Sequence, residues 1–457
     1  MAEILKFSRF MKTKERNGIV AVFNSLHPQP VFIDKETWAN FIEKKGQGEN
    51  GQAISELLVS QGLIISNEKE DNMAIENIRQ EYEATNKQVS ILYLILTHRC
   101  NFRCSYCFEI SYEDEKREGE MMSNEIAKKG VDLFVNHLKQ KRKENRRCLV
   151  ILYGGEPLLN KKACVYTVKY VRFLQEQNIL PERTEVVIIT NGSMITKELA
   201  DFFRNNKVSV IVSIDSYLEE VNNCCRVDKN FKGTFSRTMK AIELLKSAGT
   251  DLGASVTITP YNVNSLDKIP GWLKELGINN YGLNRLVGNT YKMIGSNMPE
   301  KEYSAKAVRQ IINCFTEARK LGIYEDRMGR KINAFISGEF YPTDCGAYGE
   351  QIVIQPNGDI SICHADWDYS IDSVKNANNL LVWNSSLVRK WKERLPLYKE
   401  NCLNCEAIGI CGGGCAYSAK QCNGSICSLD IEFCRHTKET LDFLIWDLYE
   451  QSKNADR

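Results

Sequence analysis

The chain has 457 residues, 43% of them apolar, which is too long for one ordinary domain and enough to bury two or three cores. Sixty basic residues against 58 acidic ones leave a net charge of +2, so no overall field favours nucleic acid or an anionic membrane as partner. The first residues lack the apolar core of a signal peptide, and the most apolar short run, Ile91 to Leu96, is far too short to span a membrane. We therefore expect a multidomain cytoplasmic protein that binds neither nucleic acid nor membranes.

Seventeen cysteines are unusual in a chain without an export signal, because a reducing compartment keeps thiols from pairing as disulfides. Metal binding is the natural alternative. Three cysteines form a tight group between residues 100 and 107, and nine more crowd between residues 345 and 434. The other five, which we expect to be buried as small hydrophobic residues, are Cys148, Cys164, Cys224, Cys225 and Cys314.

Residues 1–85 predict a small α+β module. Its short apolar runs alternate with helix-like stretches: the runs are residues 19–23, 31–33 and 63–65, and the stretches are residues 35–43 and 53–61. Residues 68–88 are rich in Glu, Asn, Lys and Gln, which is typical of a solvated helix or an interdomain linker.

From residue 89 onward, short Val, Ile and Leu runs predict buried strands. The six runs are residues 89–96, 148–153, 185–189, 208–214, 253–258 and 281–286. Amphipathic helical patterns lie between them, at residues 123–141, 162–176, 197–205, 234–248 and 265–276. This alternation predicts a parallel sheet of βα units, open or curled into a partial barrel, with ligands bound at the carboxyl ends of the strands. After about residue 335 the chain becomes Cys-rich, Gly-rich and irregular, which suggests metal-dependent folding.

A Cys-x3-Cys-x2-Cys motif, Cys100, Cys104 and Cys107, follows the first of these strands. Three thiolates this close can hold three irons of a cubane cluster and leave the fourth iron open to an outside ligand. The alternatives are a zinc site, which would want a fourth protein ligand nearby, and three unrelated thiols. The position directly after a strand of a parallel sheet favours the cluster, and an open iron is what reductive cleavage of S-adenosylmethionine (SAM) requires.

With this motif, residues 89–290 resemble the radical SAM superfamily. The resemblance implies that the SAM amine and carboxylate chelate the open iron and that one electron then yields a 5′-deoxyadenosyl radical. Gly154, Gly155 and Glu156, after the second strand, look like the family's GGEP segment, whose glycine backbone and glutamate carboxylate receive the SAM amino group. Glycine suits such a site because only a bare backbone approaches a ligand this closely.

The resemblance implies further SAM-binding residues, with ordinary turn and capping roles as the alternative. They are Tyr106 inside the cysteine motif, Asn191 after the third strand, and Ser213 and Asp215 after the fourth. Arg226 would meet the SAM carboxylate in a charge-assisted pair unless it is a surface residue.

The second group of cysteines, between residues 345 and 434, resembles the SPASM domain, a C-terminal extension that binds auxiliary 4Fe-4S clusters. The spacing is Cys345, Gly358-x4-Cys363, Cys402-x2-Cys405-x5-Cys411-x3-Cys415 and Cys434. By resemblance, one cluster is completed by Cys402, Cys405, Cys411 and Cys434, and another is held by Cys345, Cys363 and Cys415. Structural zinc is the alternative, because paired Cys-x2-Cys units also occur in zinc ribbons.

Two departures from the family pattern bear on function. Fully ligated members have another cysteine a few residues before Cys345, where this chain has Gly338 to Asp344. One auxiliary iron would then be open to a substrate thiolate, unless Cys422, Cys427 or His364 closes the site.

The second departure lies directly after Cys363, where anaerobic sulfatase-maturating enzymes place an Asp that acts as the catalytic base. This chain has His364 there and Asp366 two residues on, and both are candidate catalytic residues because a histidine can act as a base near neutral pH. We expect His98, beside the first motif, to be a loop residue.

These observations predict an α/β protein with three domains: a winged-helix-like module over residues 1–85, a partial (β/α)6 radical SAM barrel over 86–335 and a SPASM domain over 336–457. The first module would bind the leader of a ribosomally made precursor peptide as an added strand, or would only cap the barrel. The cofactors would be SAM and three 4Fe-4S clusters, with flavodoxin or ferredoxin as electron donor.

The leading hypothesis is a peptide maturase that abstracts a hydrogen from the precursor and forms a thioether or carbon-carbon cross-link. An anaerobic sulfatase-maturating enzyme, which converts Cys or Ser to formylglycine, is the second hypothesis. A non-catalytic zinc-ribbon binding protein is the third, and the first cysteine motif disfavours it.

Overall fold

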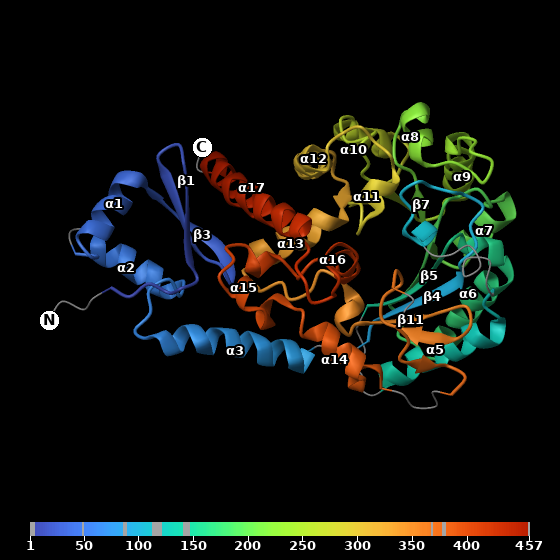
Figure 1. Ribbon diagram of the computed structural model, residues 1–457, viewed down its shortest axis with the longest axis horizontal. Helices are drawn as coiled ribbons and strands as arrows, with labels where there is room; N and C mark the ends of the chain where they lie inside the picture. Colours follow the sequence, from blue (N-terminus) through green and yellow to red (C-terminus); the bar gives the residue numbers. More distant parts are fainter. Residues whose placement is uncertain are drawn as a thin grey trace.

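Three regions follow one another along the longest axis of the molecule (Figure 1). The computed structural model describes residues 5–47, 50–85, 89–111, 121–139, 147–366, 369–376 and 381–455. The N-terminal module lies at one end, the α/β barrel at the other, and most of the cysteine-rich C-terminal region lies between them.

The N-terminal module is a three-stranded antiparallel sheet covered by helices. Its strands, in the order β1-β2-β3, are β1 (Met11–Arg16), β2 (Ile19–Asn24) and β3 (His27–Asp34). Asp34 caps α1 (Lys35–Glu43) by accepting a 2.8 Å hydrogen bond from the Thr37 amide, and α2 (Gly51–Ser60) follows. The sequence did not predict β1, because its side chains are mostly charged and partly exposed, as is usual at a sheet edge, and so form no apolar run.

The apolar run at residues 63–65 lies outside the three strands of this sheet. This segment makes only an isolated bridge between Phe7 and Ile64, and its apolar character comes from Leu63 and Ile65, which are buried. The solvated helix predicted next is present as α3 (Glu68–Thr85), while residues 86–88 of that prediction lie outside the described residues.

Successive side chains of β2 point to opposite faces of the sheet, and the two faces pack against different parts of the protein. Val20 and Val22 pack with α1 and α2 in one small core, whereas Ala21 and Phe23 pack against the last helix of the chain, α17 (Ile431–Ala455). The module therefore buries one face of its sheet internally and the other against the C-terminal region.

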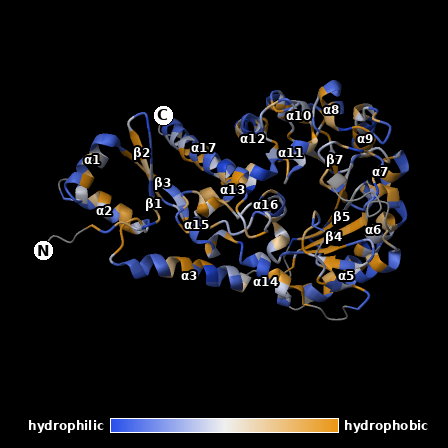
Figure 2. Cartoon of the chain, viewed as in Figure 1, coloured by the Kyte–Doolittle hydropathy of each residue, from blue (hydrophilic) through white to orange (hydrophobic). Residues whose placement is uncertain are grey.

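The barrel confirms the predicted parallel strands to within two residues at each end. They are β4 (Ile91–Thr97), β5 (Cys148–Gly154), β6 (Thr184–Thr190), β7 (Val208–Ser213), β8 (Leu252–Thr257) and β9 (Asn280–Asn284). They pair in sequence order, and β4 and β5 are hydrophobic along their length because helices cover them (Figure 2).

The predicted barrel helices are also present, except that residues 140 and 141 of the first lie outside the described residues. They are α5 (Asn124–Lys139), α6 (Lys161–Glu176), α7 (Lys197–Asn205), α9 (Phe235–Ala248) and α10 (Ile269–Glu275). The structure adds α8 (Glu219–Cys225), α11 (Thr290–Met293), α12 (Glu300–Leu321) and α13 (Asp326–Ser337).

The barrel sheet extends beyond these strands on both sides, to ten strands within the described residues. The two-residue β10 (Tyr324–Glu325) pairs in parallel with β9. On the other side β11 (Gln351–Ile354) pairs in parallel with β4 and is followed by the antiparallel β12 (Asp359–Ser361) and β13 (Asp372–Ser373). The C-terminal region therefore contributes strands to the barrel sheet.

The rest of the C-terminal region is short helices and loops, followed by the 25-residue α17. The short helices include α14 (Ser386–Lys392), α15 (Glu400–Leu403) and α16 (Ala416–Asn423). This region docks directly on the N-terminal module: the Gly409 amide donates a 2.9 Å hydrogen bond to the Ser25 carbonyl, and a Cβ at Gly409 would lie 2.7 Å from the Ser25 and Leu26 carbonyl oxygens. Glycine is needed at position 409 for this close approach.

Across the described ranges, no helix combines the length and the apolar character that crossing a membrane requires.

Candidate active site

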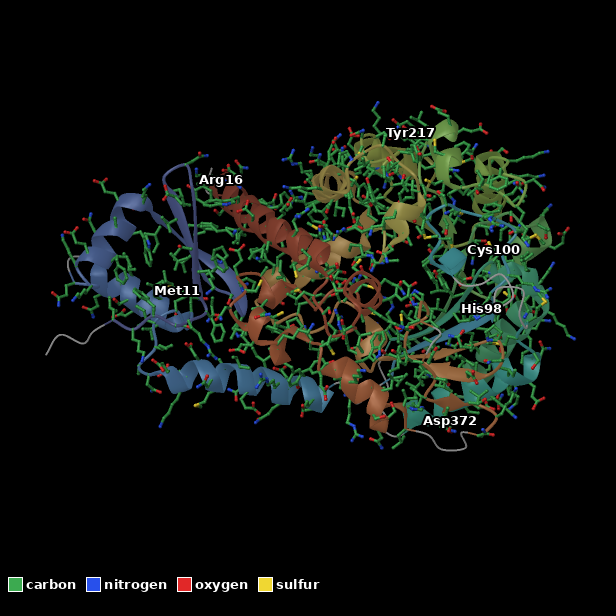
Figure 3. All side chains as sticks on the ribbon, in the orientation of Figure 1. Met11, Arg16, His98, Cys100, Tyr217 and Asp372 are labelled. Carbon is green, nitrogen blue, oxygen red and sulfur yellow. The ribbon has the colours of Figure 1, made fainter. Side chains whose placement is uncertain are left out.

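The first cysteine motif lies in the loop after β4, at the barrel end where the parallel strands finish (Figure 3). The loop is tied to the segment after α8, because the amides of Arg103 and Ser105 donate to the carbonyls of Val227 and Cys225 at 2.7 and 3.0 Å. The Cys107 amide turns back to the Cys104 carbonyl at 3.0 Å. These bonds hold all three partly buried thiols, Cys100 among them, in one short loop.

The environment of these thiols suits a metal cluster. Burial raises the pKa of Cys100 well above its usual value, and the nearby Glu156 and Cys104 raise it further. Burial also raises the pKa of Cys104, against the effect of the Arg226 guanidinium. Buried thiols that repel one another as thiolates need a bound cation to stay deprotonated, which iron supplies.

A single zinc ion and a cubane cluster place different demands on the cysteines. Within the described part of the chain, no three His, Cys, Asp or Glu side chains converge closely enough to hold one metal ion. A single tetrahedral zinc needs its sulfurs about 4 Å apart, given Zn–S bonds of about 2.3 Å, whereas each thiolate of a cubane binds a different iron.

Gly154 and Gly155 let the β5 strand end approach the cysteine loop. A Cβ at Gly154 would lie 2.2 Å from the Thr97 carbonyl oxygen, and one at Gly155 would lie 2.4 and 2.5 Å from those of Arg99 and His98. The Gly155 amide donates to Thr97 at 2.9 Å. The close contact with the cysteine loop therefore requires glycine at both positions. The sequence had suggested only that glycine would let the backbone approach a ligand.

The Glu156 carboxylate is fully buried and accepts three hydrogen bonds from the protein. They come from the Leu158 amide at 3.0 Å, the Thr190 hydroxyl at 2.7 Å and the Asn191 amide at 2.7 Å. Burial raises the pKa of Glu156 despite these bonds. A carboxylate has about four acceptor sites, so one remains for an ammonium group such as that of SAM.

Tyr106, Asp215 and Arg226, which the resemblance proposed as SAM-binding, lie together. The Tyr106 hydroxyl donates to Asp215 Oδ2 at 2.5 Å and accepts from Arg226 Nη1 at 2.6 Å, and Arg226 Nη1 is 3.7 Å from Asp215 Oδ2. Asp215 Oδ1 also accepts from the Thr257 amide at 2.9 Å. Burial raises the pKa of Asp215, while Arg226 acts to lower it.

Arg226 is the best indication that a polar ligand belongs here. Its side chain is only 6% exposed, yet its Nε has no hydrogen-bond partner among the described residues. A buried guanidinium with a free donor costs free energy that an anionic ligand would offset. The residues present therefore fit SAM, whose carboxylate Arg226 would bind.

Asn191 and Ser213 are placed differently. The Asn191 amide group lies 3.9 Å from Cys100 Sγ and 3.0 Å from Asn101 Oδ1, so it borders the cysteine loop. Ser213 lies at the end of β7 opposite Ser255 of β8, partly exposed.

Electrostatic interactions group the C-terminal cysteines into two sets. In the first set, burial raises the pKa of Cys363 well above its usual value, and Cys345 and Cys415 are the charges that do most to raise it further. Each of these three thiols accepts a hydrogen bond from a backbone amide two or three residues on. In the second set, burial raises the pKa of Cys434 to about 12, and the neighbouring charges are Cys411, Cys402 and Cys405.

Other cysteines lie apart from these sets. Cys422 and Cys427 are exposed, and the charges near Cys422 include Asp430, Glu300 and Lys292. Of the five cysteines predicted to be buried, Cys224 is exposed near the end of α8 and that prediction was wrong; the other four are buried. None of the seventeen cysteines, all of which the structure describes, forms a disulfide.

His364 sits among aromatic rings, next to Cys363. Its ring centroid lies 5.0 Å from that of Tyr93 on β4 and 5.0 Å from that of Tyr153 on β5, with Phe108 at 6.2 Å. Burial, with the nearby Arg327, lowers the pKa of His364 to about 4, so the ring is neutral at pH 7. Sequence reasoning missed the two tyrosines, although Tyr153 directly precedes Gly154.

Asp366, the other catalytic candidate, is 2% exposed and bound to a lysine. Its oxygens accept from Lys420 Nζ at 2.9 and 3.2 Å, and Lys420 also lies 4.5 Å from the centre of the Tyr369 ring. His98 lies on the loop after β4 with Nδ1 3.9 Å from Glu109 Oε1.

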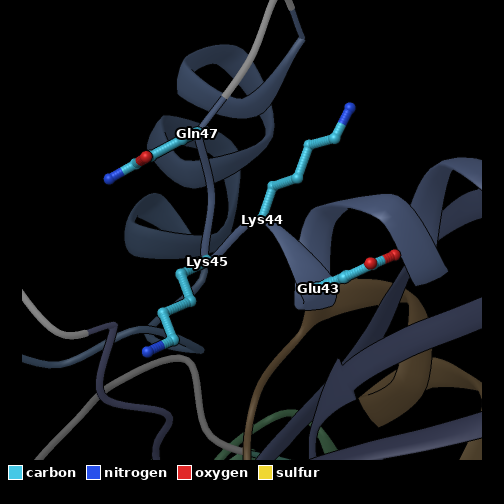
Figure 4. Close-up of a pocket in the computed structure, with 4 residues that line it drawn as sticks. All are labelled: Glu43, Lys44, Lys45 and Gln47. Carbon is cyan, nitrogen blue, oxygen red and sulfur yellow. The ribbon is translucent and has the colours of Figure 1, made fainter.

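A shallow depression at the end of α1, lined by Glu43, Lys44, Lys45 and Gln47, belongs to none of these sites (Figure 4). Its labelled side chains point away from one another, so they define no convergent binding group.

Comparison with known families supports this description. The radical SAM superfamily model matches residues 94–276, and the model of SPASM, an iron-sulfur cluster-binding domain, matches residues 345–406. The parallel barrel and the cysteine loop after β4 define an enzyme class: this chain is a radical SAM superfamily enzyme, with SAM and iron-sulfur clusters as cofactors. Within that superfamily it belongs to the members with a SPASM domain.

Two curated proteins resemble much of the chain. The radical SAM cyclopropyl synthase TigE of Paramaledivibacter caminithermalis is 23% identical over 99% of this chain and 97% of its own length. A cysteine-type anaerobic sulfatase-maturating enzyme of Clostridium perfringens is 22% identical over 80% of this chain and 99% of its own.

Two solved structures share the fold. One is anSMEcpe with bound AdoMet and a Cp18Cys peptide, with a TM-score of 0.65 and 19% identity over 80% of this chain and 99% of that one. The other is Streptococcus suis SuiB bound to precursor peptide SuiA, with a TM-score of 0.53 and 15% identity over 94% of this chain and 100% of that one.

Proposed function

We propose that this enzyme matures a ribosomally made precursor peptide by abstracting a hydrogen atom and joining a cysteine sulfur to the resulting carbon radical as a thioether. The thiol would lose its proton, and the one remaining electron would pass to an auxiliary iron-sulfur cluster. SAM bound beside Cys100, Cys104 and Cys107 supplies the 5′-deoxyadenosyl radical for the abstraction. Arg226 binds the SAM carboxylate, and Glu156 uses its remaining acceptor site for the SAM amine.

The position of Tyr153 carries this proposal. Burial raises the pKa of Tyr153, and the charges that raise it further include both Cys107 and Cys363. Its phenol therefore lies within electrostatic reach of the radical SAM loop and of the first auxiliary set. A peptide side chain beside Tyr153 and His364 would be accessible to both sites at once.

The composition of the first auxiliary set favours a thioether over a carbon-carbon bond. The set brings together Cys345, Cys363 and Cys415, against four cysteines in the second set. A cubane in the first set would have one iron without a cysteine from that set, and a substrate thiolate is the natural fourth ligand. We propose one 4Fe-4S cluster in each of the three sites.

The edge of the N-terminal sheet provides a place for the leader of the precursor. Within the described residues, β1 is hydrogen-bonded on one side only, to β2. An extended leader would add to the free edge through main-chain hydrogen bonds. SuiB, which shares the fold, is solved with its precursor peptide SuiA and supports a peptide as substrate.

A cytoplasmic location and a flavodoxin or ferredoxin as electron donor complete the proposal. A reducing compartment keeps thiols unpaired, which is the state of the cysteines in this structure.

A second candidate function is the oxidation of a Cys or Ser to formylglycine. The likeness to anSMEcpe and to the Clostridium perfringens maturase favours it. His364 would then act as the base beside Cys363.

The first experiment is anaerobic reconstitution, followed by iron and sulfide analysis and by an assay for 5′-deoxyadenosine. About twelve irons per chain are expected for three clusters of four, with deoxyadenosine lost in a Cys100/Cys104/Cys107→Ala variant. Stoichiometric zinc or no SAM cleavage would refute the proposal.

Peptides encoded beside the gene are then incubated with enzyme, SAM and dithionite. A thioether lowers the peptide mass by two hydrogens and removes one free thiol, whereas formylglycine reacts with hydrazides.

A further inference from the structure

The five-residue loop Cys411–Cys415 joins the two auxiliary cysteine sets, since its first cysteine belongs to one and its last to the other. Between them lie Gly412, Gly413 and Gly414, with φ angles of 66°, 85° and 69°. This left-handed backbone suits glycine, and a Cβ at Gly412 would lie 2.4 Å from the Asp344 amide nitrogen. The loop therefore fixes the separation of the two sets.

A buried lysine holds the first end of this loop. Lys331 of α13 is 1% exposed, and its Nζ donates to the carbonyls of Ile410 and Cys411 at 3.2 and 3.3 Å. It lies 3.5 Å from Asp344 Oδ1 and 4.6 Å from the centre of the Phe433 ring. The charge that most opposes the burial of the Cys411 thiolate is this ammonium group.

A buried arginine holds the other end. Arg394, also 1% exposed, donates to the carbonyls of Gly413, Gly414 and Ile426 at 2.9, 3.1 and 2.7 Å. Burial lowers its pKa, while Cys415 and then Cys345 are the foremost charges that raise it. Among the ion pairs of the described residues, none includes Arg394.

A buried cation is costly unless anions compensate it, and the foremost anions near Arg394 are the Cys415 and Cys345 thiolates, followed by the Asp430 carboxylate. The potential of an iron-sulfur cluster depends on net charge, hydrogen bonding and exposure. A fixed positive charge stabilises the reduced cluster, which carries one more electron, more than the oxidised one. Arg394 acts on Cys415 and Cys345 more than on Cys411 of the other set, so its effect would fall more on the first set's cluster. Lys331 is the foremost charge acting on Cys411, so its effect would fall on the second set's cluster.

We propose that Lys331 and Arg394 set the reduction potentials of the two auxiliary clusters separately. Lys331 raises the potential of the cluster in the Cys402, Cys405, Cys411 and Cys434 set, and Arg394 raises that of the cluster in the Cys345, Cys363 and Cys415 set. This inference rests on the proposed function, which places a cluster in each set. Neither residue touches substrate or SAM in this role.

The test is an EPR-monitored redox titration of the full reconstituted enzyme. The Lys331→Gln substitution removes the charge but keeps a donor, and Lys331→Arg keeps both. Cys434→Ala and Cys363→Ala identify the two midpoints by removing one signal each. We expect Lys331→Gln to lower the midpoint that Cys434→Ala abolishes, Lys331→Arg to restore it, and Arg394→Gln to lower the other midpoint.

Arg172→Gln is the matched control, because Arg172 also binds main-chain carbonyls, those of Thr184, Asn206 and Lys207, at the opposite end of the barrel strands. It should leave every midpoint unchanged. An unshifted midpoint in Lys331→Gln, or an equal shift in Arg172→Gln, overturns the inference. If Arg394→Gln fails to fold, the midpoint measured for Lys331→Gln still tests the inference. A wild-type iron content far below about twelve refutes the proposed function instead.

Discussion

The imidazole of His364 stacks on the phenol of Tyr93, with ring centroids 5.0 Å apart and ring planes 17° apart. This contact joins a residue next to Cys363 to strand β4, whose end leads into the first cysteine loop. Replacing His364 by Phe keeps the stacking and removes the ring nitrogens. We expect normal folding and SAM cleavage, with peptide modification slowed at least about tenfold, as loss of a positioned base implies. Peptide mass spectrometry measures this, and modification at the wild-type rate would show that His364 only packs.

The Tyr106 hydroxyl links Asp215 to Arg226. Replacing Tyr106 by Phe should weaken SAM binding by about 1–2 kcal/mol, because Arg226 loses the group that orients it. Calorimetric titration of the reconstituted enzyme with SAM measures the affinity. The control is Tyr170→Phe, which removes a similar 2.6 Å bond to Asp132 on the barrel exterior and should leave affinity unchanged. Equal affinities in both variants would count against a role in SAM binding.

Gly155→Ala should prevent cluster assembly at the first site. The added methyl group would overlap two backbone oxygens of the cysteine loop, and backbone cannot move aside as a flexible side chain can. Iron analysis should show the loss of about four irons per chain. Gly271→Ala is the control, since a Cβ there meets nothing within 4 Å on helix α10. It should keep full iron content and gain up to about 1 kcal/mol of stability. Full iron content in Gly155→Ala would contradict the expectation.

Asp366→Asn should destabilise the fold, because Lys420 would keep a charge in a partly buried site without its partner. A loss of about 2–3 kcal/mol in the free energy of unfolding is expected, and a double-mutant cycle with Lys420→Gln should recover part of it. Anaerobic urea unfolding measures both. A stable Asp366→Asn variant that has lost peptide modification would instead assign Asp366 the catalytic role that its sequence position suggests.

Sequence periodicity was enough to predict the barrel, because strands buried on both faces consist of continuous apolar runs. The division of the C-terminal cysteines into two auxiliary sets, which the resemblance to SPASM domains implies, stays a prediction. The sequence could not predict that Tyr93 and His364, 271 positions apart, would stack, since that contact depends on β11 pairing with β4. Nor could composition reveal that Lys331 and Arg394 are buried, because lysine and arginine are usually exposed.

The pairing of β11 with β4 also limits how this enzyme can be recombined with its relatives. A chimera cut near residue 335 would separate two hydrogen-bonded strands and leave the β4 edge unpaired beside the cysteine loop. The new partner would have to supply a strand of matching register, from Gln351 opposite Ile91 to Ile354 opposite Leu94. A functional exchange of the auxiliary region therefore requires a replacement whose strand pairs with β4 in the correct register.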